Sequence, residues 1–197
     1  MEREQLIIFY RNPVIGKVKT RLASDVGEER ALAIYLLLAN HTMHITRDLR
    51  ASKTVYYSSH IDREDNWDNY LYTKDLQAGN DLGERMQNAF AKGFNKGYRS
   101  ICIIGTDCIG LNTPIIESAF AQLARYDAVV GPAKDGGYYL LGMKKLYSRL
   151  FTGKQWGNDT VLADTLSDLE SMKLHFTTLP VLTDVDTVDD LPEEWRR

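Results

Sequence analysis

Five short runs of almost unbroken apolar residues constrain the fold of this 197-residue chain more than any other feature. Strands that face solvent on one side alternate apolar with polar residues, so unbroken runs indicate strands that are buried on both faces. Segments with helical spacing lie between most of these runs, at 28–49, 83–94 and 114–123. Strands that alternate with helices predict an α/β chain, in which helices cover both faces of a parallel sheet. The predicted strands are Gln5 to Tyr10, Lys53 to Ser59, Ser100 to Asp107, Asp127 to Ala133 and Gly137 to Met143.

The composition is typical of one globular domain spanning residues 1–197, because 44% of the residues are hydrophobic. Its 24 basic and 27 acidic residues give a net charge of −3, so the total charge indicates neither nucleic acid nor an anionic membrane as a partner. The apolar helical run from Ala31 to Ala39 is too short to cross a bilayer, which needs about 20 residues. The N-terminus lacks the pattern of a secretory signal. We therefore expect a soluble, cytoplasmic protein with small-molecule partners, and its oligomeric state stays open.

The two cysteines, Cys102 and Cys108, lie six positions apart on one predicted strand. Six strand residues span about 20 Å, whereas a disulfide needs Cα atoms within about 7 Å. We expect two reduced thiols, and Cys108 has no obvious histidine partner that would activate it.

Acidic residues stand at the boundaries of two predicted strands. Asp107 ends the run "IIGTD", and Asp135 precedes the pair Gly136 and Gly137 in "AKDGGYYLLG". Ligands of open α/β sheets bind at the carboxyl ends of strands, and glycines let a ligand approach the backbone. Asp107 could instead be a plain cap or turn residue before Pro114.

A third acidic element, "LTDVDTVDDL", places Asp184 and Asp186 two residues apart, so that they point the same way in an extended segment. Together with Asp107 they predict a Mg²⁺ site, with Mn²⁺ as a possible substitute, because Mg²⁺ is held by one or two carboxylates, waters and substrate phosphates. The alternative for this element is a capped helix start, with Asp186 or Thr187 as the cap. Both interpretations can hold for different residues.

A basic segment follows the first predicted strand. It carries Arg11, Lys17, Lys19 and Arg21 around Gly16. Such a loop can surround phosphates, because glycine allows close backbone approach and cations neutralise charge. The spacing of a Walker motif is absent, and four cations in eleven residues could equally form a solvated face.

The segment "QAGNDLGERMQNAF" begins a predicted helix, with Asp81 as the N-cap and Glu84 three residues later. Its functional interpretation places Asn80, Asp81 and Arg85 beside a nucleotide. Spacing alone favours the cap.

Two other features receive structural interpretations. His41 and His44 lie three residues apart on one predicted helix, but no third metal ligand clusters near them in the sequence, so we expect surface or packing histidines. The polar run from Asp62 to Asn69 is predicted to be a surface loop.

Five motifs, in this order and spacing, resemble the bacterial radical-SAM/selenodomain-associated transferase 1 family, a branch of the GT-A nucleotide-diphospho-sugar transferases. The resemblance extends from about residue 5 to residue 191 and implies a three-layer, Rossmann-like GT-A fold with a mostly parallel central sheet. Relatives of this family include guanylyltransferases that act on phospholactate and on molybdopterin cofactor. The motifs are "PVIGKVKTRLA", "GNDLGERMQNAF", "IIGTDCIGL", "GPAKDGGYYLLGM" and "DVDTVDDL".

In those relatives the loop after the first strand holds nucleotide phosphates, and the aspartate after the central strand binds the metal. The resemblance therefore implies phosphate contacts from Gly16, Lys17, Lys19 and Arg21, and metal binding by Asp107.

The late D-x-D of Asp184 and Asp186 resembles the acidic element that completes the metal site in several relatives. Many members read D-C-P after the central strand and W-S-T before the late helix, where this chain has Asp107-Cys108-Ile109 and Trp156-Gly157-Asn158. These departures leave the metal ligand in place and fall on acceptor-side contacts.

Together these features predict a Mg²⁺-dependent transferase in which Asp107, Lys19 and Arg21 stabilise charge on the phosphates of an activated nucleotide. The favoured reaction is nucleotidyl transfer to a small phosphorylated or hydroxyl acceptor, with release of pyrophosphate. Glycosyl transfer from a nucleotide-sugar is one alternative. A catalytically silent nucleotide-binding partner is another, although such a module has no need to gather several acidic groups.

Overall fold

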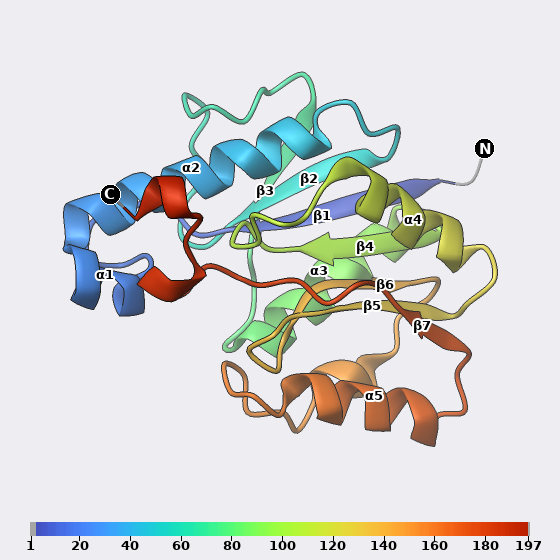
Figure 1. The fold of residues 1–197 in the computed structure, drawn as a ribbon. Helices are drawn as coiled ribbons and strands as arrows, with labels where there is room; N and C mark the ends of the chain where they lie inside the picture. Colours follow the sequence, from blue (N-terminus) through green and yellow to red (C-terminus); the bar gives the residue numbers. More distant parts are fainter. Residues whose placement is uncertain (1–2, 197) are drawn as a thin grey trace.

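The computed structural model describes residues 3–196, and within them a seven-stranded sheet forms the centre of the fold (Figure 1). The strand order is β3-β2-β1-β4-β6-β5-β7, and every pairing is parallel except those of β6, which runs antiparallel to β4 and β5. This mixed α/β architecture with a mostly parallel sheet confirms the predicted fold class. The strands are β1 (Glu4–Tyr10), β2 (Ser52–Tyr57), β3 (Tyr72–Leu76), β4 (Ser100–Ile104), β5 (Ala128–Pro132), β6 (Tyr138–Met143) and β7 (Phe176–Thr178).

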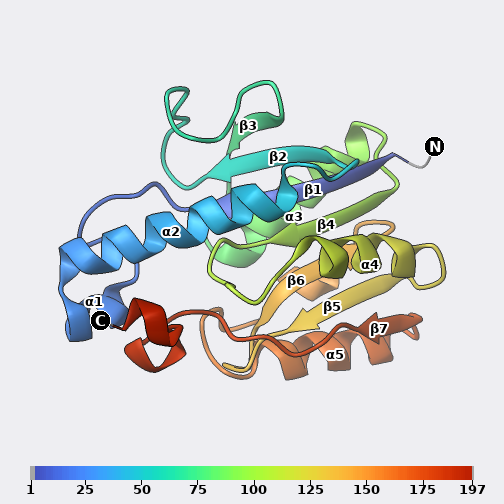
Figure 2. The same ribbon diagram turned by 45° about the horizontal axis from the view of Figure 1, so that its top comes forward.

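Helices cover both faces of the sheet (Figure 2). Successive side chains of a strand point to opposite faces, so Leu6 and Ile8 of β1 pack with α2 and α4, whereas Ile7 packs with α3 and α5. All three side chains are fully buried, which explains why β1 reads as an unbroken apolar run. The helices are α1 (Thr20–Val26), α2 (Glu28–Thr46), α3 (Leu82–Asn95), α4 (Thr113–Leu123) and α5 (Val161–Ser171), and short 3₁₀ turns occupy Ser148–Phe151, Val188–Asp190 and Glu193–Trp195. No helix within residues 3–196 combines the length and the apolar character needed to cross a membrane.

Several element boundaries differ from the sequence prediction. β4 ends at Ile104, its last residue paired with β1, so Asp107 lies in the loop beyond the strand and not at its final position. β5 and β6 are joined by a turn too short for a parallel crossover, and they therefore pair antiparallel. The sequence prediction missed β3, β7, α1 and α5. The two strands were missed because β3 is a polar edge strand with the sequence YTKDL and β7 has only three residues.

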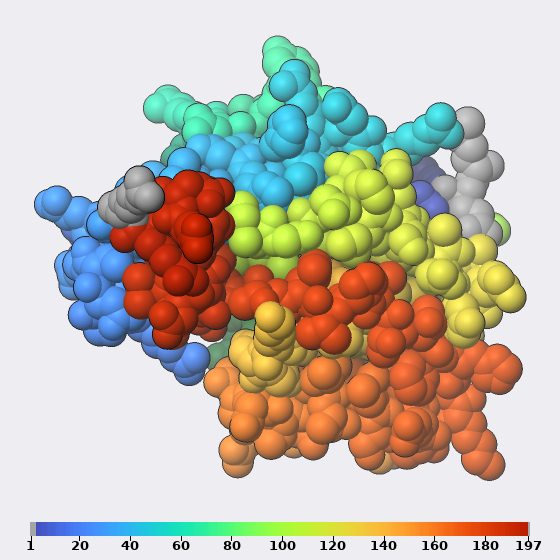
Figure 3. Space-filling model, in the orientation of Figure 1, coloured from blue at the N-terminus to red at the C-terminus, as the bar shows by residue number. Residues whose placement is uncertain are grey.

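The C-terminal segment crosses the molecule and returns to the N-terminal helices (Figure 3). The backbone N–H of Val185 donates to the carbonyl oxygen of Asp107 at 2.9 Å, which fixes this segment beside the loop after β4. Val185 and Leu191 pack with Leu22 of α1 and Ile34 of α2 in a separate apolar cluster. These contacts bring the first and last parts of the chain to the same edge of the sheet.

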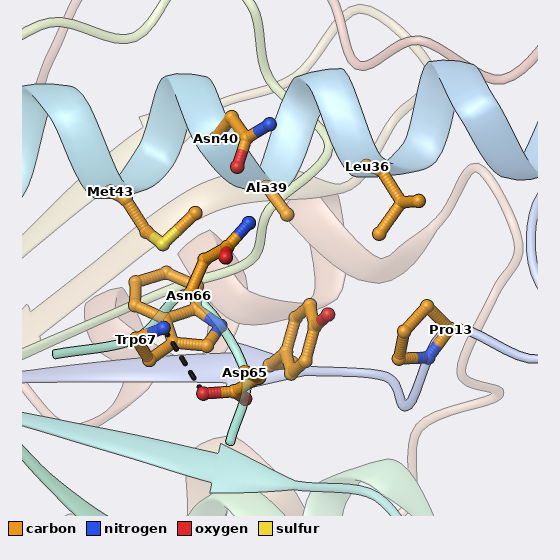
Figure 4. Close-up of a pocket in the computed structure, with 9 residues that line it drawn as sticks. Pro13, Leu36, Ala39, Asn40, Met43, Asp65, Asn66 and Trp67 are labelled. Atoms are coloured by element: carbon orange, nitrogen blue, oxygen red, sulfur yellow. Dashed lines mark hydrogen bonds between the residues drawn. The ribbon is translucent and has the colours of Figure 1, made fainter. Parts of the chain in front are cut away.

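The polar segment 62–69 lies on the surface as predicted, but one buried side chain anchors it. Trp67 is 1% exposed and contacts the rings of Tyr10 and Tyr72 at centroid distances of 5.6 and 5.0 Å. Its backbone N–H donates to Asp65 Oδ1 at 3.1 Å, and both residues line a small pocket of about 130 Å³ beneath α2 (Figure 4). The loop is therefore held by aromatic packing, although its composition is polar.

Replacing Trp67 by alanine should lower the free energy of unfolding by about 3–5 kcal/mol, because it removes a fully buried aromatic side chain. Urea denaturation measures this loss. Tyr70 in the same region is 99% exposed, and Tyr70→Ala should change stability by less than about 0.5 kcal/mol. Equal effects of the two substitutions would contradict an anchoring role for Trp67.

Candidate functional site

A cleft of about 1030 Å³ opens at the edge of the sheet where β1 to β4 end and β6 begins. Its lining comes from the loops after these four parallel strands, from the β5–β6 turn, from the segment before α5 and from the C-terminal segment. Because β6 is antiparallel, its amino end lies at the same edge as the carboxyl ends of its neighbours. This is the place where ligands bind in open α/β sheets.

A buried lysine joins two of the predicted metal-binding carboxylates. Lys19 Nζ lies 2.7 Å from Asp107 Oδ1 and 3.2 Å from Asp186 Oδ1, and the lysine side chain is 5% exposed. Asp107 Oδ1 makes no hydrogen bond of regular geometry within the described residues, so the ion pair is the contact that compensates its charge. Burial opposes the charge of Lys19, but attraction by both carboxylates outweighs it and raises the pKa of the lysine.

The backbone around Lys19 fixes this arrangement. Lys19 precedes α1 with φ 49° and ψ 46°, a left-handed conformation that is uncommon for residues other than glycine. Arg21, two residues further on, keeps an exposed guanidinium with Nη1 3.9 Å from Asp186 Oδ2. The basic segment therefore supplies one buried, paired cation and one exposed cation to the cleft.

The third carboxylate, Asp184, is half-buried, with the Cys108 thiol beside it. Its Oδ1 atom has no hydrogen bond to any described residue. Burial, reinforced by the negative charges of Asp107, Asp135 and Asp186 and opposed by Lys19, raises the pKa of Asp184 to about 7. Unlike the other two carboxylates, Asp184 thus has an energetic need for a proton or a cation.

The donor set suits a divalent cation that arrives with a nucleotide. Among residues 3–196 no group of three or more His, Cys, Asp or Glu side chains is already arranged around a metal position. Mg²⁺ commonly takes only one or two protein carboxylates and completes its shell with waters and phosphates. Asp107 and Asp186 supply two converging carboxylates, and Asp184 supplies an unsatisfied oxygen, so these residues fit such an ion.

The predicted nucleotide-contacting residues at the start of α3 and just before it also line the cleft. Asp81 caps the helix as predicted, with Oδ1 accepting from the backbone N–H of Glu84 at 2.8 Å. The Glu84 carboxylate accepts from Asn80 rather than from Asp81, so it holds the preceding loop. Arg85 Nε donates to the carbonyl oxygen of Gly79 at 3.1 Å and faces the cleft with Asn80 and Asp81.

Three residues of the predicted site lie outside the cleft lining, whereas Arg11, Asp135 and Gly137 form part of it. Lys17 is exposed, and the hydrogen bonds described for it are made by its backbone: its carbonyl oxygen accepts from Arg11 Nη1 at 3.3 Å, and its N–H donates to the Val14 carbonyl oxygen at 3.0 Å. A Cβ on Gly16 would lie 3.0 Å from the Glu28 carboxylate.

Gly136 is the third residue outside the lining. It has φ +88°, and a Cβ there would overlap the backbone of Asp159. The absence of side chains at Gly16 and Gly136 therefore accommodates neighbouring protein atoms.

Several cleft residues were missed by sequence reasoning. Tyr35 of α2 donates its hydroxyl to the carbonyl oxygen of Arg11 at 2.6 Å and accepts from the Arg11 N–H at 3.0 Å, and no local pattern signals this contact. Ser58 and Gln77 follow β2 and β3, so the strand-end rule would have found Gln77 had β3 been predicted. Asp159 carried no recognisable signal.

The histidines and cysteines have structural surroundings, as expected. His41 Nε2 is hydrogen-bonded to the Leu111 carbonyl oxygen at 2.8 Å, and His44 is exposed. Cys102 and Cys108 are buried free thiols. Burial, with Asp184 nearby, raises the pKa of Cys108 to about 12, which leaves the thiol protonated and unreactive.

Known proteins share sequence and fold with this chain. A family model described as "Uncharacterized protein conserved in bacteria (DUF2064)" matches residues 42–158. A structure from Desulfovibrio desulfuricans G20, provisionally assigned as a nucleotide-diphospho-sugar transferase, shares 32% identity at a TM-score of 0.88, over 95% of this chain and 84% of that one. No curated protein matches the chain.

More distant structures share the fold alone. A cytidylyltransferase from Leptospira borgpetersenii has 13% identity and a TM-score of 0.60, over 96% of this chain and 84% of that one. The inositol-1-phosphate CTP transferase from T. maritima has 13% identity and a TM-score of 0.56, over 98% and 93% of the two chains. The predicted nucleotide-diphospho-sugar transferase fold is thereby confirmed.

The raised pKa of Asp184 predicts a stability that falls as pH rises. The folded state keeps a proton that the unfolded chain releases near pH 4, so the free energy of unfolding should decrease between about pH 4 and pH 7, by as much as about 4 kcal/mol, and then level off. Urea denaturation of the wild type and Asp184→Asn in metal-free buffer measures this, because asparagine does not titrate. Asp189→Asn, at an exposed carboxylate of the same segment, is the control. A wild-type profile parallel to that of Asp184→Asn would contradict the prediction.

Two glycines with the same backbone conformation separate strain from crowding. Gly136→Ala should cost about 1–3 kcal/mol more than Gly157→Ala, because only the Cβ at 136 would overlap backbone atoms. Gly157 has φ +86° and no described atom within 4 Å, so its substitution reports the backbone strain alone. Thermal denaturation compares the two. Equal costs would mean that the β5–β6 turn is not packed against Asp159.

Proposed function

We propose that this chain, which belongs to the DUF2064 family, is a metal-assisted transferase that holds an activated nucleotide in its cleft. The observation that carries the proposal is the convergence of Lys19, Asp107 and Asp186 at the carboxyl edge of the sheet. A buried cation held between two carboxylates beside a large cleft is costly to maintain for stability alone. It suits a site that must receive both phosphates and a divalent cation.

The basic side chains of the cleft would bind the phosphates. Arg11, Arg21 and Arg85 line it together with Lys19; Arg11 and Lys19 lie in the loop after β1, Arg21 in α1 and Arg85 in α3. Guanidinium groups bind phosphate oxygens through paired hydrogen bonds. Lys19, once its carboxylates hold a metal, is free to turn its ammonium toward a phosphate.

Asp107 and Asp186 would hold the metal, and Asp184 would complete or support the site. When bound, Mg²⁺ or Mn²⁺ supplies Lewis-acid stabilisation of charge on the phosphates. The chain itself orients the nucleotide and neutralises developing charge through fixed cations, which is electrostatic catalysis by positioning.

Nucleotidyl transfer is the reaction that we favour. An acceptor oxygen attacks the α-phosphorus of a nucleoside triphosphate, the bond from the α-phosphorus to the bridging oxygen breaks, and pyrophosphate leaves with that oxygen. Glycosyl transfer is the second candidate, supported by the provisional assignment of the Desulfovibrio desulfuricans relative. In that case an acceptor oxygen bonds to the sugar C1, the bond from C1 to the diphosphate oxygen breaks, and a nucleoside diphosphate leaves with that oxygen. Retention of three carboxylates argues against a silent binding partner.

The finer family assignment is also a proposal. The five motifs support membership of the radical-SAM/selenodomain-associated transferase 1 group, with residues 1–197 as one domain. Two buried, unpaired cysteines support a reducing compartment such as the cytoplasm.

Asp107→Asn should abolish the Mg²⁺-dependent part of nucleotide binding and leave the fold intact, because it removes a charged ligand from a hard cation. In thermal shift measurements with nucleoside triphosphates and nucleotide-sugars, a ligand at 100 times its Kd should stabilise the wild type by about 2.7 kcal/mol. The variant should lose the increment that Mg²⁺ adds. Glu117→Gln, on the exposed face of α4, is the matched control. A metal increment that survives in Asp107→Asn would show that this carboxylate is structural.

Lys19→Met tests the same site in the opposite direction. Because its ammonium neutralises the two carboxylates, its removal should tighten Mn²⁺ binding to nucleotide-free protein by about tenfold. Calorimetric titration measures this affinity.

A separate measurement on the wild type distinguishes the two reactions: nucleotidyl transfer releases pyrophosphate, whereas glycosyl transfer releases a nucleoside diphosphate.

A further inference from the structure

All the basic side chains among the described cleft-lining residues lie in one half of the cleft. That half holds Arg11, Lys19, Arg21 and Arg85, together with the carboxylates of Asp81, Asp107, Asp184 and Asp186. The other, here called the distal half, consists of the cleft-lining residues of the β5–β6 turn with the start of β6 (135–139) and of the segment 156–161. Among the described residues that line the distal half there is no lysine or arginine, whereas two of them, Asp135 and Asp159, are acidic. An anion placed there would meet negative charge and no compensating cation.

The nearest lysines do not supply that cation. Lys154 is 2% exposed and is held by the carboxylate of Asp168. Lys134 is exposed, precedes Asp135 and lies outside the cleft lining. The negative character of the distal half is therefore a property of the cleft itself.

The distal half instead offers an aromatic surface and hydrogen-bonding groups. Trp156 lies against Gly83 at the start of α3, where any Cβ would overlap the indole, so the ring has a fixed position. Asn158 Oδ1 accepts from the N–H and the hydroxyl of Thr160, at 3.0 and 2.9 Å, which orients the amide beside Asp159. Tryptophan combines a flat apolar face with a polar edge, and carboxylates accept hydrogen bonds from hydroxyl groups.

The two segments of the distal half are joined to each other and lie close to the candidate reaction centre. The N–H of Leu162 donates to the Gly136 carbonyl oxygen at 2.8 Å, which ties the segment before α5 to the β5–β6 turn. Asp135 lies near enough to Asp184 for its charge to contribute to the raised pKa of that carboxyl group. The cleft volume of about 1030 Å³ is at the upper end of single-ligand pockets, so it has room for a second substrate group beside a nucleotide.

We propose that the distal half is the subsite for the non-nucleotide substrate group, and that it takes a phosphate-free, hydroxyl-bearing group and rejects phosphate esters. This inference rests on the proposed nucleotide-dependent transfer and narrows its acceptor to the hydroxyl class. Trp156 provides the contact surface, and Asp159 is the specificity-determining residue because its charge disfavours a phosphate. The same subsite would hold the sugar if the nucleotide is a nucleotide-sugar.

Matched pairs of probes test the inference. Wild-type protein loaded with Mg²⁺ and its best nucleotide from the thermal shift screen is titrated by calorimetry with glycerol, D-ribose, D-glucose and inositol, and with the monophosphate ester of each. At least one unphosphorylated probe should bind, about tenfold or more tightly than its ester, because like charges disfavour the ester. Asp159→Lys should reverse this preference. Glu117→Lys, which adds the same charge outside the cleft, should not.

The outcomes distinguish failure of the distal-half assignment from failure of the proposed function. An ester that binds the wild type as tightly as its parent alcohol, or failure of every unphosphorylated probe to bind, would overturn the distal-half assignment while nucleotide binding still stands. An Asp159→Lys variant that keeps the wild-type preference and nucleotide affinity would also overturn it. Failure of all nucleotides to bind the wild type would instead overturn the proposed function, and the inference with it.

Discussion

The ammonium group of Lys19 is the element on which the arrangement of the site depends. It lies between Asp107 and Asp186, and it thereby joins the loop after β1, the loop after β4 and the C-terminal segment. Without a cation at this position, the carboxylates of Asp107 and Asp186 would repel each other in the cleft. The nearby Asp184 already has an oxygen without a hydrogen bond and a raised pKa. The energetic cost of gathering like charges explains why the site carries its own cation.

The orientation of one strand gives the cleft its second wall. β6 runs antiparallel to its neighbours, so the β5–β6 turn and the start of β6 lie at the edge where the parallel strands end. The basic side chains of the described cleft lining come from the segments that follow β1 and β3, whereas the β5–β6 turn and the segment before α5 supply Asp135 and Trp156 and no lysine or arginine. This unequal distribution of cations suits a ligand that has a phosphate part and a neutral part.

The sequence predicted the elements of the fold whose burial requires a mainly apolar sequence. The strands β1, β2, β4, β5 and β6 are buried on both faces over most of their length, so their sequences are mainly apolar and do not alternate. Asp81 had the local spacing of a cap. The edge strand β3 and the short β7 left no such mark, because an edge position tolerates polar residues and three residues carry no period. Trp67 was likewise hidden inside a polar segment.

The sequence by itself determined the α/β class, the approximate strand positions and the presence of acidic and basic groups near strand ends. Only the tertiary structure decided which of these groups meet. The sequence gives no indication that Lys19 has a partner, yet its side chain is buried against Asp186, 167 positions away. Lys17, two residues earlier, is exposed. The physical reason is that strand order, the left-handed backbone at Lys19 and the return path of the C-terminal segment set side-chain partners, and these depend on long-range packing that no local pattern records.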